Sequence, residues 1–158
     1  MSDLSHVDDE GRARMVDVSG KDVTVRMARA TGAIRMQRET LEAIQANAIA
    51  KGDVLGVARL AGIMAAKRTS ELVPLCHPIP LSDIRIDITL DDTLPGLRVE
   101  ATAKTAAQTG VEMEAIIAVS VTLVTVYDMA KALDKSMVIG EILLVEKAGG
   151  RSGYWSRT

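Results

Sequence analysis

Aromatic residues are nearly absent from this chain of 158 residues, which contains one Trp, two Tyr and no Phe. Proteins that bind single-stranded nucleic acids commonly stack bases on aromatic side chains, so this class of function is disfavoured. The core must instead be built from Val, Ile, Leu, Ala and Met, which supply nearly all of the 47% of the chain that is hydrophobic. Small aliphatic side chains suit helices that pack closely on a sheet.

Excess charge, paired cysteines and long apolar runs are lacking as well. A formal net charge of -2 gives no overall attraction to nucleic acids or anionic membranes. The longest uncharged apolar run, Ala115–Tyr127, has 13 residues and is too short to cross a bilayer. The N-terminus lacks the apolar core of a signal peptide, and the single cysteine, Cys76, cannot form an internal disulfide. We therefore expect a cytoplasmic protein that binds neither nucleic acid nor membrane.

The length of the chain predicts one domain that spans residues 1–158. Residues 1 to about 14 and residues 150–158 are polar or Gly-rich and have no apolar period. We expect both ends to be flexible until something orders them.

Alternating apolar and polar residues predict two strands, Ile84–Leu90 and Leu97–Ala103. The turn-rich segment Asp91–Gly96 joins them into a hairpin. A further strand is expected within Val23–Met36. The mostly apolar segment Met137–Val145 predicts a strand that is covered on both faces.

Three helices are predicted between and after these strands. The first covers Arg38–Asn47 with Gly52 available to end it, and the second covers Asp53–Arg68 with Asp53 as its N-cap. The third, Val111–Asp134, is rich in Val and Thr, which oppose helix formation, but its length and charged ends favour a helix. The second helix has a face of small residues that permits close packing: Ala58, Ala61, Gly62 and Ala65.

The resulting order, strand, helices, strand, strand, helix, strand, is typical of a ferredoxin-like α+β fold. We expect an antiparallel sheet with helices packed on one face and an additional helical segment. The fold alone does not define a function.

The segment Val73–Leu81, with the sequence VPLCHPIPL, concentrates unusual residues: the only Cys, one of two His and three of four Pro. A Cys76–His77 nucleophile pair is disfavoured because neighbours in an extended segment point in opposite directions. A zinc site lacks ligands, since the other histidine, His6, lies in the N-terminal tail. Two interpretations remain, a rigid connector or a stiff wall that presents His77 to a ligand.

Paired charges mark both ends of the third helix. Asp128 and Lys131 are three residues apart on one face, so they form either a surface ion pair or, if shielded, an acid–base pair. Shielding would lower the pKa of the lysine. Glu112 and Glu114 suit the positive end of the helix dipole. Because they lie on different faces, we expect at most one of them to face any given pocket.

Basic residues at the helix ends allow two interpretations. Lys51 lies between the first two helices and Lys67 ends the second, so they are either solvated or hold phosphate. The C-terminal segment Ala148–Gly153 is similar to a phosphate-contacting tail but lacks the spacing and context of a P-loop.

Five blocks of the sequence together resemble one family: MVDVSGK, KGDVLGVARLAGIMAAKRTSELVPLCHPIPLS, TGVEMEA, YDMAKALDKSMVIGEI and GGRSG. They resemble the molybdenum cofactor biosynthesis protein C family, the cyclic pyranopterin monophosphate synthases, over residues 15–153. The resemblance implies a ferredoxin-like fold with an added helical part, and a hexamer of three dimers with pockets at the dimer interfaces. It also implies conversion of 3',8-cyclo-7,8-dihydro-GTP to cyclic pyranopterin monophosphate with release of pyrophosphate.

The same resemblance implies roles for individual residues. Asp128 and Lys131 are expected to be catalytic, moving protons while the ring system is rebuilt. Substrate binding is expected from Leu75, Cys76, His77, Met113, Glu114, Lys51, Lys67, Glu112, Lys147 and, less strongly, Arg26. Lys51, Lys67 and Lys147, with Arg151 as a further candidate, would neutralise the triphosphate. No metal site and no required cofactor are expected, and magnesium carried with the triphosphate is left open.

The C-terminal tail departs from the family pattern. The family often has Ser and Lys where this sequence has Ala148 and Arg151. Arginine binds phosphate but is a poor proton donor, so Arg151 is given no acid–base role.

Two other functions stay open from the sequence. A regulatory module that only binds a purine nucleotide would need the cations but not Asp128. A structural oligomer would bind no anion specifically.

Overall fold

The structure is a computed structural model that describes residues 6–8 and 10–158. Its strands form one antiparallel sheet in the order β2-β3-β1-β4-β5. In chain order the elements are β1 Thr24–Arg35, α1 Arg38–Gln45, α2 Val54–Ala66, α3 Thr69–Leu72, β2 Asp83–Asp91, β3 Gly96–Ala107, α4 Glu112–Ala130, β4 Val138–Ala148 and β5 Trp155–Ser156.

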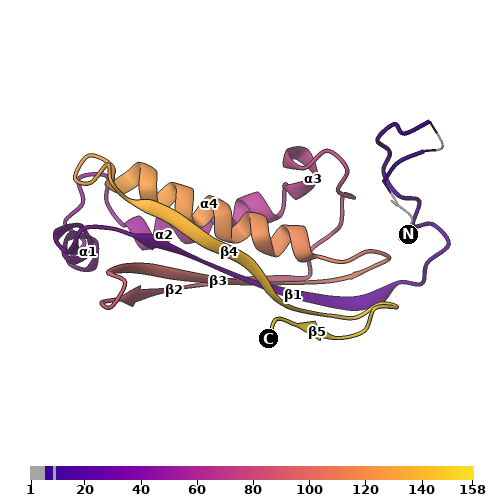
Figure 1. Ribbon diagram of the computed structural model, residues 1–158. Coiled ribbons are helices and arrows are strands. Elements are labelled where there is room, and N and C mark those ends of the chain that lie inside the picture. The colour runs from indigo at the N-terminus through magenta and orange to yellow at the C-terminus, as the bar shows by residue number, and fades with distance from the viewer. Residues whose placement is uncertain (1–5, 9) are drawn as a thin grey trace.

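The connectivity confirms the predicted ferredoxin-like α+β fold. β1 and β3 are the central pair, β2 flanks β3, and β4 flanks β1. Figure 1 shows α2 and α4 side by side on one face of the sheet, with α1 beyond one end of these helices and α3 near the other. α1 and the short α3 supply the additional helical part.

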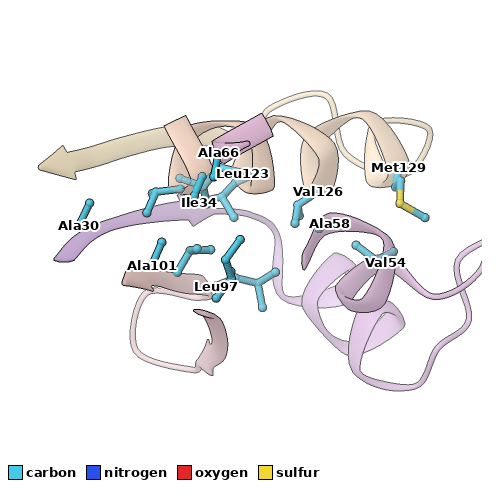
Figure 2. Packing of buried hydrophobic residues seen from close by; sticks show 14 of the residues in the cluster. Ala30, Ile34, Val54, Ala58, Ala66, Leu97, Ala101, Leu123, Val126 and Met129 are labelled. Carbon is cyan, nitrogen blue, oxygen red and sulfur yellow. The ribbon is translucent and has the colours of Figure 1, made fainter. Parts of the chain in front are cut away.

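The core lies between the sheet and the two long helices (Figure 2). Ile34 of β1 pairs with Leu97 of β3, and both side chains are fully buried. Alanines occupy four further buried positions of the central strands, and their small side chains let the helices pack close to the sheet: Ala28, Ala30, Ala101 and Ala103. The lack of aromatic residues therefore does not weaken the core, because close helix–sheet packing replaces bulky side chains.

Two glycines mark where backbones approach most closely. A Cβ on Gly32 would collide with Val119 and Leu123 of α4. One on Gly62 of α2 would collide with Thr122 Oγ1 and the Ala118 carbonyl of α4. The predicted small-residue face therefore packs mainly against the neighbouring helix, a contact that a larger side chain at Gly62 would block.

Helix α4 confirms the predicted third helix despite its Val and Thr content. Three hydroxyls inside it donate to the carbonyl four residues earlier: Ser120 to Ile116, Thr122 to Ala118 and Thr125 to Val121. By length and composition alone this helix is apolar enough to cross a membrane, but half of it is buried within the fold. Core helices meet the same criterion.

Two details of the predicted elements are wrong. The sequence predicts that the first helix reaches Asn47, but α1 ends at Gln45, and the chain turns at Asn47, which has a positive φ of 52°, before it reaches Gly52. β4 is not covered on both faces: none of its residues is buried in the chain, because no layer covers the face opposite α4. Asp53, by contrast, is confirmed as an N-cap, since its Oδ1 accepts the Gly56 N–H at 2.9 Å.

The two predicted flexible ends include short paired segments. Val7 bridges Ala13, and β5 pairs with β4 at Lys147 and Glu146. Residues 1–5 and 9 lie outside the described residues. The flexibility of both ends and the single-domain assignment stay predictions.

Candidate active site

The predicted catalytic pair lies at the C-terminal end of α4. Lys131 Nζ donates to Asp128 Oδ1 at 2.7 Å, and Lys51 Nζ donates to Asp128 Oδ2 at 2.7 Å. Lys51 also donates to the Asp128 carbonyl at 3.0 Å, where the helix leaves its last oxygens without intrahelical partners. The loop between α1 and α2 thus carries a second cation to the carboxylate, a contact that sequence spacing did not predict.

These two lysines set the charge state of the cluster. Hydrogen bonding and charge from Lys131, followed by Lys51, lower the pKa of Asp128 to about 2, and Asp128 raises the pKa of Lys131. At neutral pH the site therefore presents a carboxylate that can accept a proton and an ammonium that can donate one. Of the two interpretations left open by the spacing, the single chain has the surface ion pair and not the shielded pair with a lowered lysine pKa. About half of each side chain is exposed.

The other predicted residues gather at the N-terminal end of α4. A hollow of about 310 Å³, here called the His77 hollow, is lined by Leu75, Cys76 and His77 of the proline-rich loop, Glu112, Met113 and Glu114 of α4, Thr109 and Gly110 before α4, and His6, Val16, Val18 and Lys21 of the N-terminal segment. The hollow lies over the end of the helix. A ligand there would meet the helix end and the loop together.

Glu112 and Glu114 both line this hollow, so the expectation that at most one would face a given pocket is wrong. A cavity over the first turn of a helix is open to residues on different faces, whereas a groove along its side is not. Glu112 accepts a hydrogen bond from Lys147 Nζ at 2.7 Å, and the two side chains form a half-buried ion pair.

Glu114 is the most unusual titratable group of the site. Only 4% of the residue is exposed, and burial raises its pKa to about 7, with a further contribution from the Glu112 charge. Near neutral pH its protonated and ionised forms coexist, so it can exchange a proton with a ligand in the hollow.

His77, on the proline-rich loop, is held in place by a contact with the N-terminal segment. His77 Nε2 lies 2.7 Å from the Val16 carbonyl, which can only accept, so Nε2 carries a proton. In the neutral ring Nδ1 is then the acceptor. Burial and the Glu114 charge raise the pKa of the neighbouring Cys76 thiol, which therefore stays protonated. This agrees with the argument against a cysteine nucleophile.

Two further hollows adjoin the first, one smaller and one larger. The Lys67 hollow, about 240 Å³, shares His77 and Glu114 with the His77 hollow and places Lys67 at its wall. The Arg26 hollow, about 360 Å³, is lined by Lys21, Asp22, Thr24, Arg26, Gly150, Arg151 and Ser152. Arg26 therefore lies beside the His77 hollow rather than in it. Its guanidinium donates to the carbonyls of Ala107 and Gln108 at 3.1 and 3.2 Å.

The predicted site is thus divided into two groups within one chain. Asp128 lies 14 residues of continuous helix after Glu114, which corresponds to about 21 Å along the axis. Figure 1 shows the two ends of α4 at opposite ends of the molecule, one near α1 and the other near α3 and the N-terminal segment. In a single chain the predicted catalytic pair cannot reach a ligand held by His77 and Glu114.

The order of the sequence blocks is that of a known family, whose model matches residues 15–150. The chain belongs to the MoaC family. This MoaC chain is similar to two proteins that are named cyclic pyranopterin monophosphate synthase. The protein from Brucella ovis is 58% identical over 153 residues, which cover 97% of this chain and 93% of the relative. The protein from Cereibacter sphaeroides is 58% identical over 97% of this chain and 96% of its own length.

Sequence reasoning missed the N-terminal segment of this MoaC chain as a wall of the site. Val16, Val18 and Lys21 line the His77 hollow, although none of them was among the predicted binding residues. The signal was present in the block MVDVSGK, whose Asp17, Ser19 and Gly20 favour a turn.

Metal-binding side chains do not cluster in residues 6–8 and 10–158. No group of three or more His, Cys, Asp or Glu side chains there is arranged to hold a metal ion. The expectation that the protein needs no cofactor stays a prediction.

Proposed function

We propose that this protein is a cyclic pyranopterin monophosphate synthase of molybdenum cofactor biosynthesis, acting on 3',8-cyclo-7,8-dihydro-GTP and releasing pyrophosphate. The observation that carries the proposal is the 58% identity to proteins of that name over 97% of the chain. The residues of the two groups are chemically suited to such a reaction.

Rebuilding the ring system needs several proton transfers. The Asp128 carboxylate can act as a base, and the Lys131 ammonium can act as an acid. Glu114, with its pKa of about 7, can move a proton in either direction near neutral pH. His77 Nδ1 can accept a hydrogen bond from the substrate while Nε2 is held by Val16.

Closing the cyclic phosphate requires cations. A hydroxyl oxygen of the sugar-derived part loses its proton to a basic group of the site and bonds to the α-phosphorus, while the bond from the α-phosphorus to the bridging oxygen breaks and pyrophosphate leaves. Positive groups stabilise the transition state and the charge on the leaving group. Lys67 makes no ion pair with any residue in the described ranges and is available for phosphate. Lys51 is paired with Asp128, and Lys147 is paired with Glu112. Each of these lysines would contact its carboxylate and a phosphate group at the same time.

We further propose that each working site is shared by two chains. A general acid or base must come within about 3 Å of the atom it serves, whereas Asp128 lies about 21 Å along α4 from Glu114. Two chains packed antiparallel about a two-fold axis near the middle of α4 would place one chain's Asp128 and Lys131 beside its partner's His77 hollow.

Exposed apolar side chains on the helical layer support this arrangement. Val57, Leu60 and Met64 of α2 are 46%, 58% and 54% exposed and have helical spacing, and Val124 of α4 is 56% exposed. Such a patch is typical of an interface. The hexamer of three dimers implied by the family resemblance, and a cytoplasmic location, are parts of the same proposal.

The decisive experiment is product analysis. Purified protein is incubated with 3',8-cyclo-7,8-dihydro-GTP, and pyranopterin and pyrophosphate are measured, with and without a chelator for magnesium. Stoichiometric formation of both products supports the synthase. Tight binding of an unchanged substrate would favour the nucleotide-binding module, and no specific binding would favour the structural oligomer.

A further inference from the structure

The N-terminal segment Val16–Lys21, here called the strap, is fixed against the body of the protein at two points. At one end the Val16 carbonyl lies 2.7 Å from His77 Nε2. At the other end the Gln108 side-chain amide donates to the carbonyls of Ser19 and Lys21 at 3.3 and 3.0 Å. The strap therefore starts at the ligand-facing histidine and ends at the loop before α4.

A turn inside the strap fixes the direction of its last residue. Ser19 N donates to Asp17 Oδ1 at 2.9 Å, and Lys21 N donates to the Val18 carbonyl at 2.9 Å. With both its N–H and its carbonyl bonded, the Lys21 backbone is held while its side chain stays free to reach a ligand.

Lys21 lies where two hollows meet. It is the one residue among those described that lines both the His77 hollow and the Arg26 hollow. The first contains the titratable groups suited to the ring chemistry, and the second adds Arg26 and Arg151. A ligand with an uncharged ring and a charged tail could therefore extend from one hollow into the other past Lys21.

The cations around these hollows differ in how far they are already engaged. Lys147 is paired with Glu112 at 2.7 Å, and Arg26 is bonded to two backbone carbonyls. Lys21 makes no ion pair and donates no side-chain hydrogen bond to the residues that the structure describes. Its ammonium loses no protein contact when it binds an anion, so the full charge is available for phosphate.

We infer that Lys21 is a phosphate-binding residue of the substrate site, held in position by the strap and by Gln108. It binds the polyphosphate of the nucleotide-derived substrate, and the pyrophosphate product, at the junction of the two hollows. This inference rests on the proposed function for the identity of the substrate, but the polyphosphate chemistry can be tested without turnover.

The test measures the binding of inorganic pyrophosphate, GTP and guanosine by calorimetry, alongside KM and kcat for the cyclised substrate. We expect Lys21→Gln to weaken pyrophosphate and GTP binding about ten-fold, the loss of one charge-assisted contact, and to raise KM with a smaller change in kcat. Lys21→Arg should keep the affinity within about two-fold, since the charge remains. Guanosine affinity should not change in either variant.

Gln108→Leu provides a second variant that keeps the charge but removes the anchor. We expect it to weaken pyrophosphate binding about three-fold, because the lysine is present but less well held. Lys104→Gln, an exposed lysine on β3, is the matched control and should bind like the unaltered protein. Melting temperature and assembly size verify that each variant is folded.

The results separate this inference from the proposed function. Unchanged pyrophosphate and GTP affinity in Lys21→Gln would overturn the inference, even if the protein turns over the substrate normally. An equal loss of guanosine binding would also overturn it, since the strap would then act through shape rather than charge. If Lys21→Gln weakens pyrophosphate binding but the unaltered protein has no synthase activity, the inference of an anion site stands and the proposed synthase function is rejected.

Discussion

The two ends of α4 carry carboxylates whose pKa values are shifted in opposite directions. At the exposed C-terminal end, two lysines lower the pKa of Asp128 to about 2. At the buried N-terminal end, loss of solvent raises the pKa of Glu114 to about 7. The helix dipole would favour the reverse order, because its positive end stabilises an anion. Local partners and burial therefore outweigh the dipole at both ends.

This difference assigns separate tasks to the two ends. A carboxylate with a pKa of about 2 is fully ionised at neutral pH, so Asp128 can organise two lysines and act as a proton acceptor. One with a pKa of about 7 can exchange its proton. Four experiments test this division of tasks, beginning with the largest expected effect.

The largest effect is expected from Asp128→Asn. The amide keeps the shape of the side chain but removes the base and the charge that orders Lys51 and Lys131, so kcat should fall about 10³-fold. Steady-state release of pyrophosphate measures it. Asp92→Asn, an exposed carboxylate in the β2–β3 turn, is the control and should be fully active. A near-normal rate in pure Asp128→Asn would remove this residue from the mechanism.

The second prediction asks whether the two ends meet between chains. His77→Ala and Asp128→Asn, each inactive, should regain about a quarter of native activity when unfolded together and refolded in equal amounts. About half of the dimers are then mixed, and one of the two pockets in each is native.

The control for this experiment combines variants from the same end. Asp128→Asn mixed with Lys131→Met leaves no native pocket and should stay inactive. Mass spectrometry verifies that the subunits have exchanged. No recovery in the first mixture after verified exchange would mean that each pocket belongs to one chain.

The third prediction concerns a cation near the buried end. Lys67→Ala should raise the dissociation constant of the substrate about ten-fold and reduce its dependence on salt, because one phosphate contact is lost. Titration at two ionic strengths measures both quantities. If affinity at low salt is unchanged, Lys67 belongs to the solvated surface.

The smallest effect is expected on stability. The folded protein keeps a proton on Glu114 up to a pKa of about 7, whereas the unfolded chain loses it near the ordinary value of 4.5. Between these values the folded state binds more protons, so the free energy of unfolding falls as pH rises and the loss is complete above about 7. The Glu114→Gln variant should lack this fall. Its free energy of unfolding should change by about 2 kcal/mol less than that of the unaltered protein between pH 5 and pH 8. Urea unfolding at both values tests it, and equal pH dependence would contradict the burial effect.

Much of the fold could be predicted because local signals agree with it. The β2–β3 hairpin has a strict apolar alternation and a turn rich in Asp and Gly, and Asp53 caps α2 as its position suggests. The exposure of β4 could not be predicted, because an apolar run does not reveal whether a second layer covers it. α1 ends before Asn47 because Asn47 adopts a left-handed conformation, with a positive φ. The sequence pattern instead indicates Gly52 as the residue for such a turn.

The sequence predicts candidate site residues, but it does not reveal how they are arranged in space. Spacing on a helix shows which residues share a face, and Asp128 with Lys131 met that test. It could not reveal that Lys51 reaches Asp128 from another loop, nor that a hollow over the helix end admits both Glu112 and Glu114. The position of Lys21 depends on a long-range contact with Gln108, which no local pattern encodes.

The Val- and Thr-rich centre of α4 also bears on how the protein folds. Residues 115–127 have no charge and no proline, and many are β-branched, a composition that favours extended, self-associating segments. Helix formation here depends on burial against the sheet, which is absent in a newly made chain. Until β1 and β3 have paired, this stretch is an aggregation hazard. Early pairing of these strands would therefore protect the helix whose two ends carry the predicted site residues.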